Sequence, residues 1–169
     1  MPNAGLVTRA QIDKMIKARR EVLDSIDWPA VKARDLRRVC IHECAHEVVA
    51  RHFGAACAVA ITPNPNGSIE EQFYTGQLEI FAKLPKPQTR LICLAGSIAE
   101  QVDRDPSVKA DDLADWLENG TLELSPTDAV GAGAYKLRDV RRCISLVKKL
   151  WPAIETAARL AIDTARAKE

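Results

Sequence analysis

The chain has 169 residues, 47% hydrophobic and 28% charged, a composition typical of a folded domain rather than a disordered polypeptide. Its 24 basic and 23 acidic side chains leave a formal net charge of +1, which argues against a protein that binds nucleic acid or anionic membranes. The absence of an apolar run of about 20 residues, of a secretory signal in residues 1–10 and of any C-x-x-C pair favours a cytoplasmic protein without a membrane segment.

The first third of the chain predicts two helices separated by a short break. Apolar residues recur at helical spacing over residues 8–25, and we expect residues 1–27 to form an N-terminal helical extension. Pro29 suits the first turn of a second helix, because proline lacks an N–H that a helix start leaves unpaired. This second helix should continue to about Phe53 and end at Gly54, since glycine readily adopts the left-handed conformation that closes a helix.

The rest of the chain predicts one small β element and four more helices. Residues 58–61 and 77–81 flank a turn-rich stretch and predict two short strands that pair antiparallel. A loop is expected over residues 103–109, and a helix break or kink at Pro152. The four helices are expected over residues 87–102, 111–118, 125–135 and 140–169. We therefore expect a single mainly α (α+β) domain over residues 1–169.

The second predicted helix carries the H-E-x-x-H motif, His42-Glu43-Cys44-Ala45-His46. Residues four apart lie on one face of a helix, about one turn from each other, so both imidazoles can bind one ion. Two imidazoles suit Zn²⁺ and leave room for a third protein ligand and a water. Glu43 follows the first ligand, where its carboxylate can take the proton of that water and pass it to a leaving amine. The motif therefore predicts a catalytic zinc ion with Glu43 as the general base.

A catalytic zinc ion needs a third protein ligand, and the residues alone leave two candidates open. Glu100, near the end of the helix predicted over residues 87–102, could bind the ion or orient a ligand histidine. Asp128 could also bind the ion, although Ser125, Pro126 and Asp128 together resemble an ordinary helix-capping arrangement. Spacing does not separate the two carboxylates.

Three other side chains suit the site less well. His52 occupies the last position of the longer pattern H-E-x-x-H-x-x-G-x-x-H, but Val49 stands where that pattern has a glycine that turns the chain. We therefore interpret His52 as an ordinary histidine at a helix end. Asp111 and Asp112 open a predicted helix, where the helix dipole favours acidic residues, and we give them the same structural interpretation.

Two segments resemble one known family. Residues 42–50, H-E-C-A-H-E-V-V-A, resemble the H-E-A-G-H-A-V-V-A stretch in the peptidase domain of FtsH-type AAA proteases. Residues 94–100, L-A-G-S-I-A-E, are similar to the G-G-R-x-A-E-E helix of that domain. The resemblance implies a zincin-like helical domain in which Asp128 completes the zinc site with the two motif histidines. It also implies that Glu100 supports the site without binding the metal.

The resemblance implies zinc-dependent hydrolysis of peptide bonds. The sequence has no G-x-x-x-x-G-K-[ST] nucleotide-binding loop, so we expect a free-standing peptidase domain without ATP-driven unfolding. Its expected substrate is a peptide or unfolded protein, and a homo-oligomer or a partner protein stays open. One alternative is a non-catalytic zinc-binding adaptor or regulator of a larger proteolytic machine. The other is a helical protein with two surface histidines and no metal.

Overall fold

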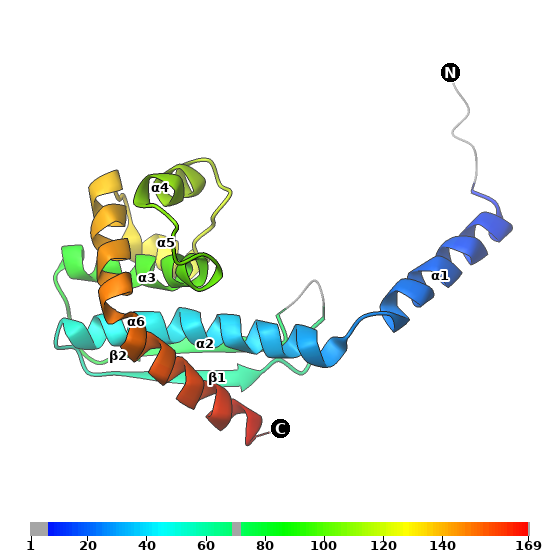
Figure 1. Cartoon of the computed structure of the whole chain (residues 1–169), viewed down its shortest axis with the longest axis horizontal. Coiled ribbons are helices and arrows are strands. Elements are labelled where there is room, and N and C mark those ends of the chain that lie inside the picture. Colours follow the sequence, from blue (N-terminus) through cyan, green and yellow to red (C-terminus); the bar gives the residue numbers. More distant parts are fainter. Residues whose placement is uncertain (1–6, 69–71, 169) are drawn as a thin grey trace. The chain divides into compact units, whose positions relative to one another are not determined.

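Figure 1 shows the structure, a computed structural model that describes residues 7–68 and 72–168. The described residues divide into two compact units, one ending at Ala33 and the other beginning at Arg34. The fold is mainly α with one small antiparallel sheet, as the sequence predicts. The elements in chain order are α1 (Arg9–Asp24), α2 (Trp28–His52), β1 (Cys57–Pro63), β2 (Tyr74–Ile80), α3 (Lys86–Arg104), α4 (Ala110–Glu118), α5 (Pro126–Ala132) and α6 (Leu137–Arg166).

Helix α1 lies in the first unit and confirms the helix predicted over residues 8–25. The Thr8 hydroxyl accepts a hydrogen bond from the backbone N–H of Gln11, and the Gln11 side chain accepts one from the backbone N–H of Thr8. This reciprocal arrangement satisfies two N–H groups that a helix start leaves unpaired. None of the α1 side chains is buried.

Helix α2 ends where the sequence predicts. The backbone N–H of Gly54 donates to the carbonyl of Arg51, and that of Ala55 donates to the carbonyl of Ala50. Gly54 has a φ of 80°, in the left-handed region that glycine adopts at little cost. These two bonds form the usual glycine-dependent helix end, after which the chain enters β1.

The two strands pair antiparallel along their whole length, with Cys57 opposite Ile80 at one end and Pro63 opposite Tyr74 at the other. Both are longer than predicted. Gly76 lies inside β2, although a glycine in the interior of a strand usually weakens it. A larger residue would not fit at this position, because the side chain of Glu43 on α2 occupies the space where its Cβ atom would lie.

Several predicted boundaries are wrong by a few residues. Phe81 follows β2 instead of ending it, and its side chain is 62% exposed. Helix α3 continues to Arg104, into the predicted loop. Helix α5 stops before Gly133, whose φ of 56° ends the helix, so the predicted helix over residues 125–135 is too long. Pro152 lies inside α6, which continues past it, and Figure 1 shows α6 changing direction partway along its length.

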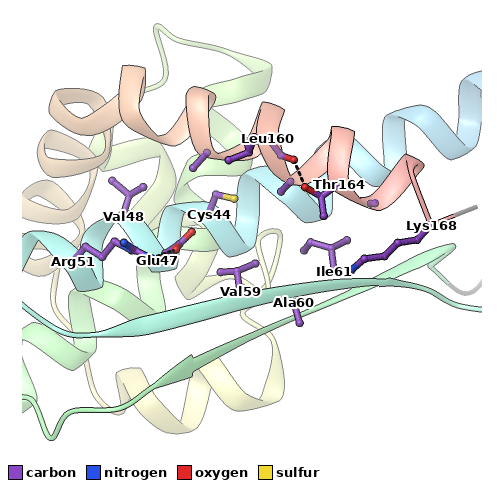
Figure 2. Close-up of a pocket in the computed structure, with 13 residues that line it drawn as sticks. Cys44, Glu47, Val48, Arg51, Val59, Ala60, Ile61, Leu160, Thr164 and Lys168 are labelled. Atoms are coloured by element: carbon purple, nitrogen blue, oxygen red, sulfur yellow. Dashed lines mark hydrogen bonds and ion pairs between the residues drawn. The ribbon is translucent and has the colours of Figure 1, made fainter.

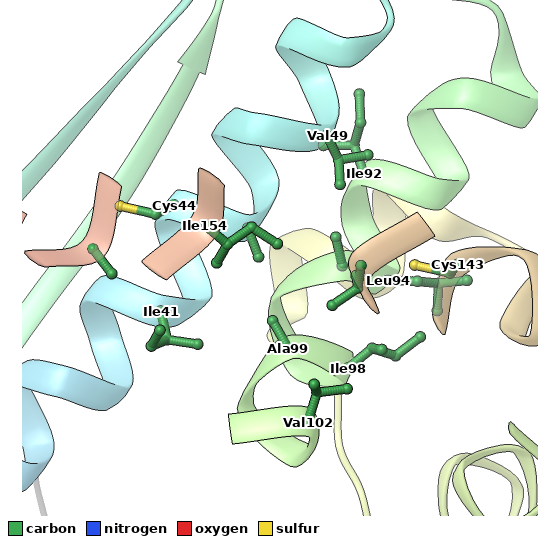
Figure 3. Packing of buried hydrophobic residues seen from close by; sticks show 14 of the residues in the cluster. Ile41, Cys44, Val49, Ile92, Leu94, Ile98, Ala99, Val102, Cys143 and Ile154 are labelled. Carbon is green, nitrogen blue, oxygen red and sulfur yellow. The ribbon is translucent and has the colours of Figure 1, made fainter. Parts of the chain in front are cut away.

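Helix α3 lies in the core of the second unit. Almost every residue in its middle is buried, and side chains from α2, α3 and α6 meet in one apolar cluster, as Figure 3 shows. The large buried side chains of this cluster include Ile41 of α2, Leu94 and Ile98 of α3, and Ile154 of α6. In the described part of the chain, no helix combines the length and apolarity needed to cross a membrane.

Candidate metal centre

Helix α2 directs the two motif histidines into the same space. His42 and His46 lie one turn apart, with ring centroids separated by 4.6 Å and ring planes at 80° to each other. His46 is 4% exposed, and His42 is partly buried. The placement on one helix face agrees with the prediction from their spacing.

Each imidazole is held at its Nδ1 atom by a residue of α3. The Nδ1–H of His42 donates to Oε1 of Glu100 at 2.7 Å. The Nδ1–H of His46 donates to the backbone carbonyl of Ile92 at 2.6 Å. Because a neutral imidazole carries one proton, these bonds leave each Nε2 with a free lone pair. Glu100 therefore contacts His42 at the ring nitrogen opposite the one that faces Asp128.

Asp128 faces both Nε2 atoms. Its Oδ2 lies 3.3 Å from Nε2 of His42, and its Oδ1 lies 3.4 Å from Nε2 of His46. The Asp128 residue is 8% exposed. The hydroxyl of Ser125 donates to Oδ2 of Asp128 at 2.7 Å and accepts from the Asp128 backbone N–H at 3.1 Å. Ser125 thus caps α5 and also orients the Asp128 carboxylate toward the two imidazoles, so the helix cap is compatible with metal binding by Asp128.

His42, His46 and Asp128 form a group that can hold a metal ion, with their ligand atoms all within 4.8 Å of one another. The other candidates lie in different surroundings. His52 is exposed at the end of α2, with its ring against Phe53. Asp111, at the start of α4, pairs with Arg141 and is also exposed, as is Asp112. The structural interpretation of these three residues agrees with their positions.

Gly96 of α3 packs directly against the Nε2 side of the two imidazoles. A Cβ atom added at Gly96 would lie 2.5 Å from Nε2 of both His42 and His46. This separation is far shorter than any ordinary contact, so only glycine allows α3 to approach the ligand atoms so closely. We did not predict this role, and the signal for it was a lone glycine within an otherwise apolar helix.

Glu43 faces the same cavity as the three candidate ligands. The cavity has a volume of about 760 Å³ and is bounded by α2, β2, α3 and the segment that leads into α5. The Glu43 side chain lies over Gly76 of β2, where an added Cβ would collide with its Cγ and Cδ. Burial raises the pKa of the Glu43 carboxyl. A partly buried carboxyl beside a metal group is a suitable proton acceptor.

Cys44 lies on a different face of α2. It lines a separate pocket of about 510 Å³ between α2, β1 and α6, shown in Figure 2, together with Glu47, Val59 and Leu160. The Cys44 residue is 1% exposed, and burial raises the pKa of its thiol to about 12. Cys44 is therefore a small buried hydrophobic residue and does not line the metal cavity.

The charges of the group favour a protonated His42 while no metal is bound. Burial lowers the pKa of His42, but its hydrogen bonds to Asp128 and Glu100 outweigh burial and raise that pKa to about 9. Burial also opposes ionisation of Asp128, but the imidazoles of His42 and His46, which face its carboxylate, hold its pKa well below the usual range. A proton on Nε2 of His42 thus occupies the position that a cation between the imidazole and the carboxylate would take.

The donor set fits a divalent transition metal. Two imidazole nitrogens and one carboxylate oxygen converge, both rings are fixed by hydrogen bonds at the opposite nitrogen, and the space between them opens into a cavity. Hydrogen bonds of this kind are typical of metal-binding histidines, because they set the tautomer and the ring orientation. Three protein ligands also leave a coordination position open to solvent or substrate.

The metal-free protein should lose stability as the pH rises from about 6.5 to about 9. A histidine whose pKa is higher in the folded than in the unfolded state stabilises the fold below its unfolded pKa, and this stabilisation disappears as pH passes the folded pKa. Over this pH range the free energy of unfolding should fall by an amount on the order of 3 kcal/mol. Thermal unfolding followed by circular dichroism at several pH values measures it. A His42→Gln variant should show a flatter profile, and equal profiles for the two proteins would contradict this assignment.

The substitution Gly96→Ala should abolish or strongly weaken metal binding while the helix remains. The new methyl group would displace both Nε2 atoms, and disturbed support of ligand histidines costs roughly tenfold or more in metal affinity. Alanine also has a higher helix propensity than glycine, so α3 itself is not weakened. Metal content after incubation with zinc, compared with the circular dichroism of the metal-free variant, tests this. If Gly96→Ala binds zinc as tightly as the parent, α3 does not approach the Nε2 atoms of His42 and His46 as closely as described.

No family model matches the chain, and no curated protein matches it. The assignment of the site therefore depends on the chemistry and geometry of its residues. The candidate ligands are His42, His46 and Asp128. Hydrogen bonds with Glu100, Ile92 and Ser125 orient them, and Glu43 lines the cavity beside them. These residues form a candidate centre for one metal ion.

Proposed function

We propose that this protein is a zinc-dependent endopeptidase that hydrolyses peptide bonds in extended or unfolded polypeptides. The observation that carries the proposal is the convergence of two imidazoles and one carboxylate in a cavity that Glu43 also lines. The motif spacing and the resemblance to FtsH-type peptidase domains support the same reading.

Zinc is the metal that the ligand set favours. Two histidine nitrogens and one carboxylate oxygen are a common set at catalytic zinc sites, which keep a fourth position for water or substrate. When bound, zinc would supply Lewis acidity to a water and to the scissile carbonyl. The ligand residues would keep their orientation through Glu100, Ile92 and Ser125.

Glu43 would act as the general base and then as the general acid. Its carboxylate would accept a proton from the attacking water and deliver it to the nitrogen of the leaving amine. The raised pKa of its carboxyl, which is due to burial, improves it as a proton acceptor at neutral pH. Gly76 leaves the space that the Glu43 side chain occupies beside β2.

The substrate would lie along β2 as an added strand. In the described part of the chain β2 pairs with no strand other than β1, so its other edge is open to an added strand beyond Tyr74, whose N–H donates to Asp35. Four successive residues of β2, Thr75 to Leu78, line the cavity, and consecutive strand residues point to opposite faces. The cavity therefore follows the edge of the strand. Such an edge binds any extended segment through its backbone, which suits an enzyme that acts on unfolded chains.

The substitution Glu43→Gln should preserve zinc binding and reduce kcat/KM for an unfolded protein or peptide by about 10²–10⁴-fold. Glutamine has nearly the same size but cannot take a proton from water. Glu47→Gln is a matched control, because Glu47 lies on the same helix, pairs with Arg51 and lines the other pocket. Fluorogenic peptide cleavage and metal analysis measure the two effects. If Glu43→Gln cleaves like the parent, the mechanism is wrong, and if the zinc-loaded parent cleaves no unfolded substrate, the non-catalytic adaptor is favoured.

The substitution Gly76→Ala should impair cleavage but leave the metal bound. The added Cβ would collide with Cγ and Cδ of Glu43 and push its carboxylate away from the attacking water. Misplacement of a catalytic group by about 1 Å costs up to about a hundredfold in rate. Gly96→Ala should instead remove the metal, so measurement of zinc content and kcat for both variants separates the two glycines. Unchanged kcat in Gly76→Ala would show that Glu43 does not act from this position.

A further inference from the structure

Two polar side chains of α2, Asp35 and Arg38, precede His42 and are not part of the metal group. Oδ2 of Asp35 accepts hydrogen bonds from the backbone N–H of Phe73 at 2.8 Å and of Tyr74 at 3.2 Å. These two N–H groups lie at the start of β2, the strand that lines the cavity. The Asp35 carboxylate therefore attaches the beginning of β2 to α2.

Arg38 connects the same carboxylate to the metal group. Its Nη2 donates to Oδ1 of Asp35 at 3.0 Å, and its Nη1 lies 3.7 Å from Oε2 of Glu100. The other oxygen of Glu100, Oε1, accepts from Nδ1 of His42. Asp35 contacts β2 through Oδ2 and Arg38 through Oδ1, and Glu100 contacts His42 through Oε1 and Arg38 through Oε2. All of these contacts can therefore exist at the same time. Together they form a continuous polar bridge from the backbone of β2 to a candidate metal ligand.

The polar bridge is largely shielded from water. The side chains of Asp35 and Glu100 are 14% and 13% exposed, and that of Arg38 is 32% exposed. Shielded charge pairs interact more strongly than pairs on an open surface, which contribute little. Arg38 and Glu100 also line the cavity itself. The bridge is thus well placed to affect the site as well as the stability of the fold.

We propose that Asp35 and Arg38 are positioning residues, which fix the substrate strand β2 and the metal ligand His42 relative to each other through Glu100. This inference rests on the proposed function, because it takes β2 as the strand that binds substrate. Arg38 keeps the Glu100 carboxylate turned toward Nδ1 of His42, so that the imidazole ring keeps the orientation in which its Nε2 faces Asp128. Asp35 holds the start of β2, so that a bound peptide would lie at a constant distance from the metal.

The first test compares Arg38→Gln with Arg37→Gln. Arg37 also forms an ion pair from α2 to α3, with Asp103, but it lies outside the cavity lining, so it is a matched control. Competition with a chromogenic chelator gives the Kd of zinc without any need for activity. Arg38→Gln should weaken zinc binding by roughly tenfold, whereas Arg37→Gln should change it less than about twofold. Equal values of Kd for the two variants would overturn the role of Arg38.

The second test compares Asp35→Ala with Asp35→Asn. In the alanine variant, hydrogen exchange at the amides of Phe73 and Tyr74 should become at least about tenfold faster. KM for a peptide substrate should rise severalfold while kcat changes less, because the strand and not the base is displaced. Asparagine retains one acceptor oxygen and should restore part of the protection. Unchanged exchange together with unchanged KM would overturn the role of Asp35.

These measurements separate the two proposals. If the parent binds zinc but cleaves no peptide, the proposed function fails, while zinc affinity and amide exchange still decide whether the polar bridge acts on His42 and β2. If the parent cleaves peptides and the variants match their controls in Kd, exchange and KM, only the inference about the polar bridge fails.

Discussion

The candidate site depends on the hydrogen bonds that hold the two imidazoles at Nδ1. An imidazole ring on a helix can rotate about its side-chain bonds, and only a fixed acceptor for one nitrogen defines where the other nitrogen points. The carboxylate of Glu100 and the carbonyl of Ile92 are these acceptors for His42 and His46. Without them the two Nε2 atoms would not converge, and Asp128 would face two mobile rings instead of a preformed set of ligand atoms.

Helix α3 supplies every one of these restraints from a single face. Three α3 residues spaced four apart contact the candidate site, and they meet three α2 residues that are also spaced four apart, in the reverse order along the chain. The α3 residues are Ile92, Gly96 and Glu100, and the α2 residues are His46, His42 and Arg38. Residues with this spacing lie in one row along a helix. The buried position of α3 therefore fixes the geometry of the candidate site and also contributes apolar burial.

The sequence predicted the elements and the metal motif well, because both depend on local patterns. Helical spacing and the turn at Gly54 located α2, and the motif defined two of the three candidate ligands. The residues alone did not separate Asp128 from Glu100, since that choice depends on how α3 and α5 pack against α2. The support from Ile92 was not predictable, because a backbone carbonyl gives no sequence signal. The role of Gly76 was not predictable either, since it depends on a tertiary contact with Glu43.

The third candidate ligand lies far from the first two along the chain. Asp128 follows His42 by 86 residues, and β1, β2, α3 and α4 lie between them. An unfolded chain would have to close this long loop before it could offer all three side chains to one ion, which carries an entropic cost. A bound ion would therefore favour the fully folded chain over any partly folded form. Metal occupancy would then report on completed folding, since a polypeptide that has not yet placed α5 can offer only two imidazoles.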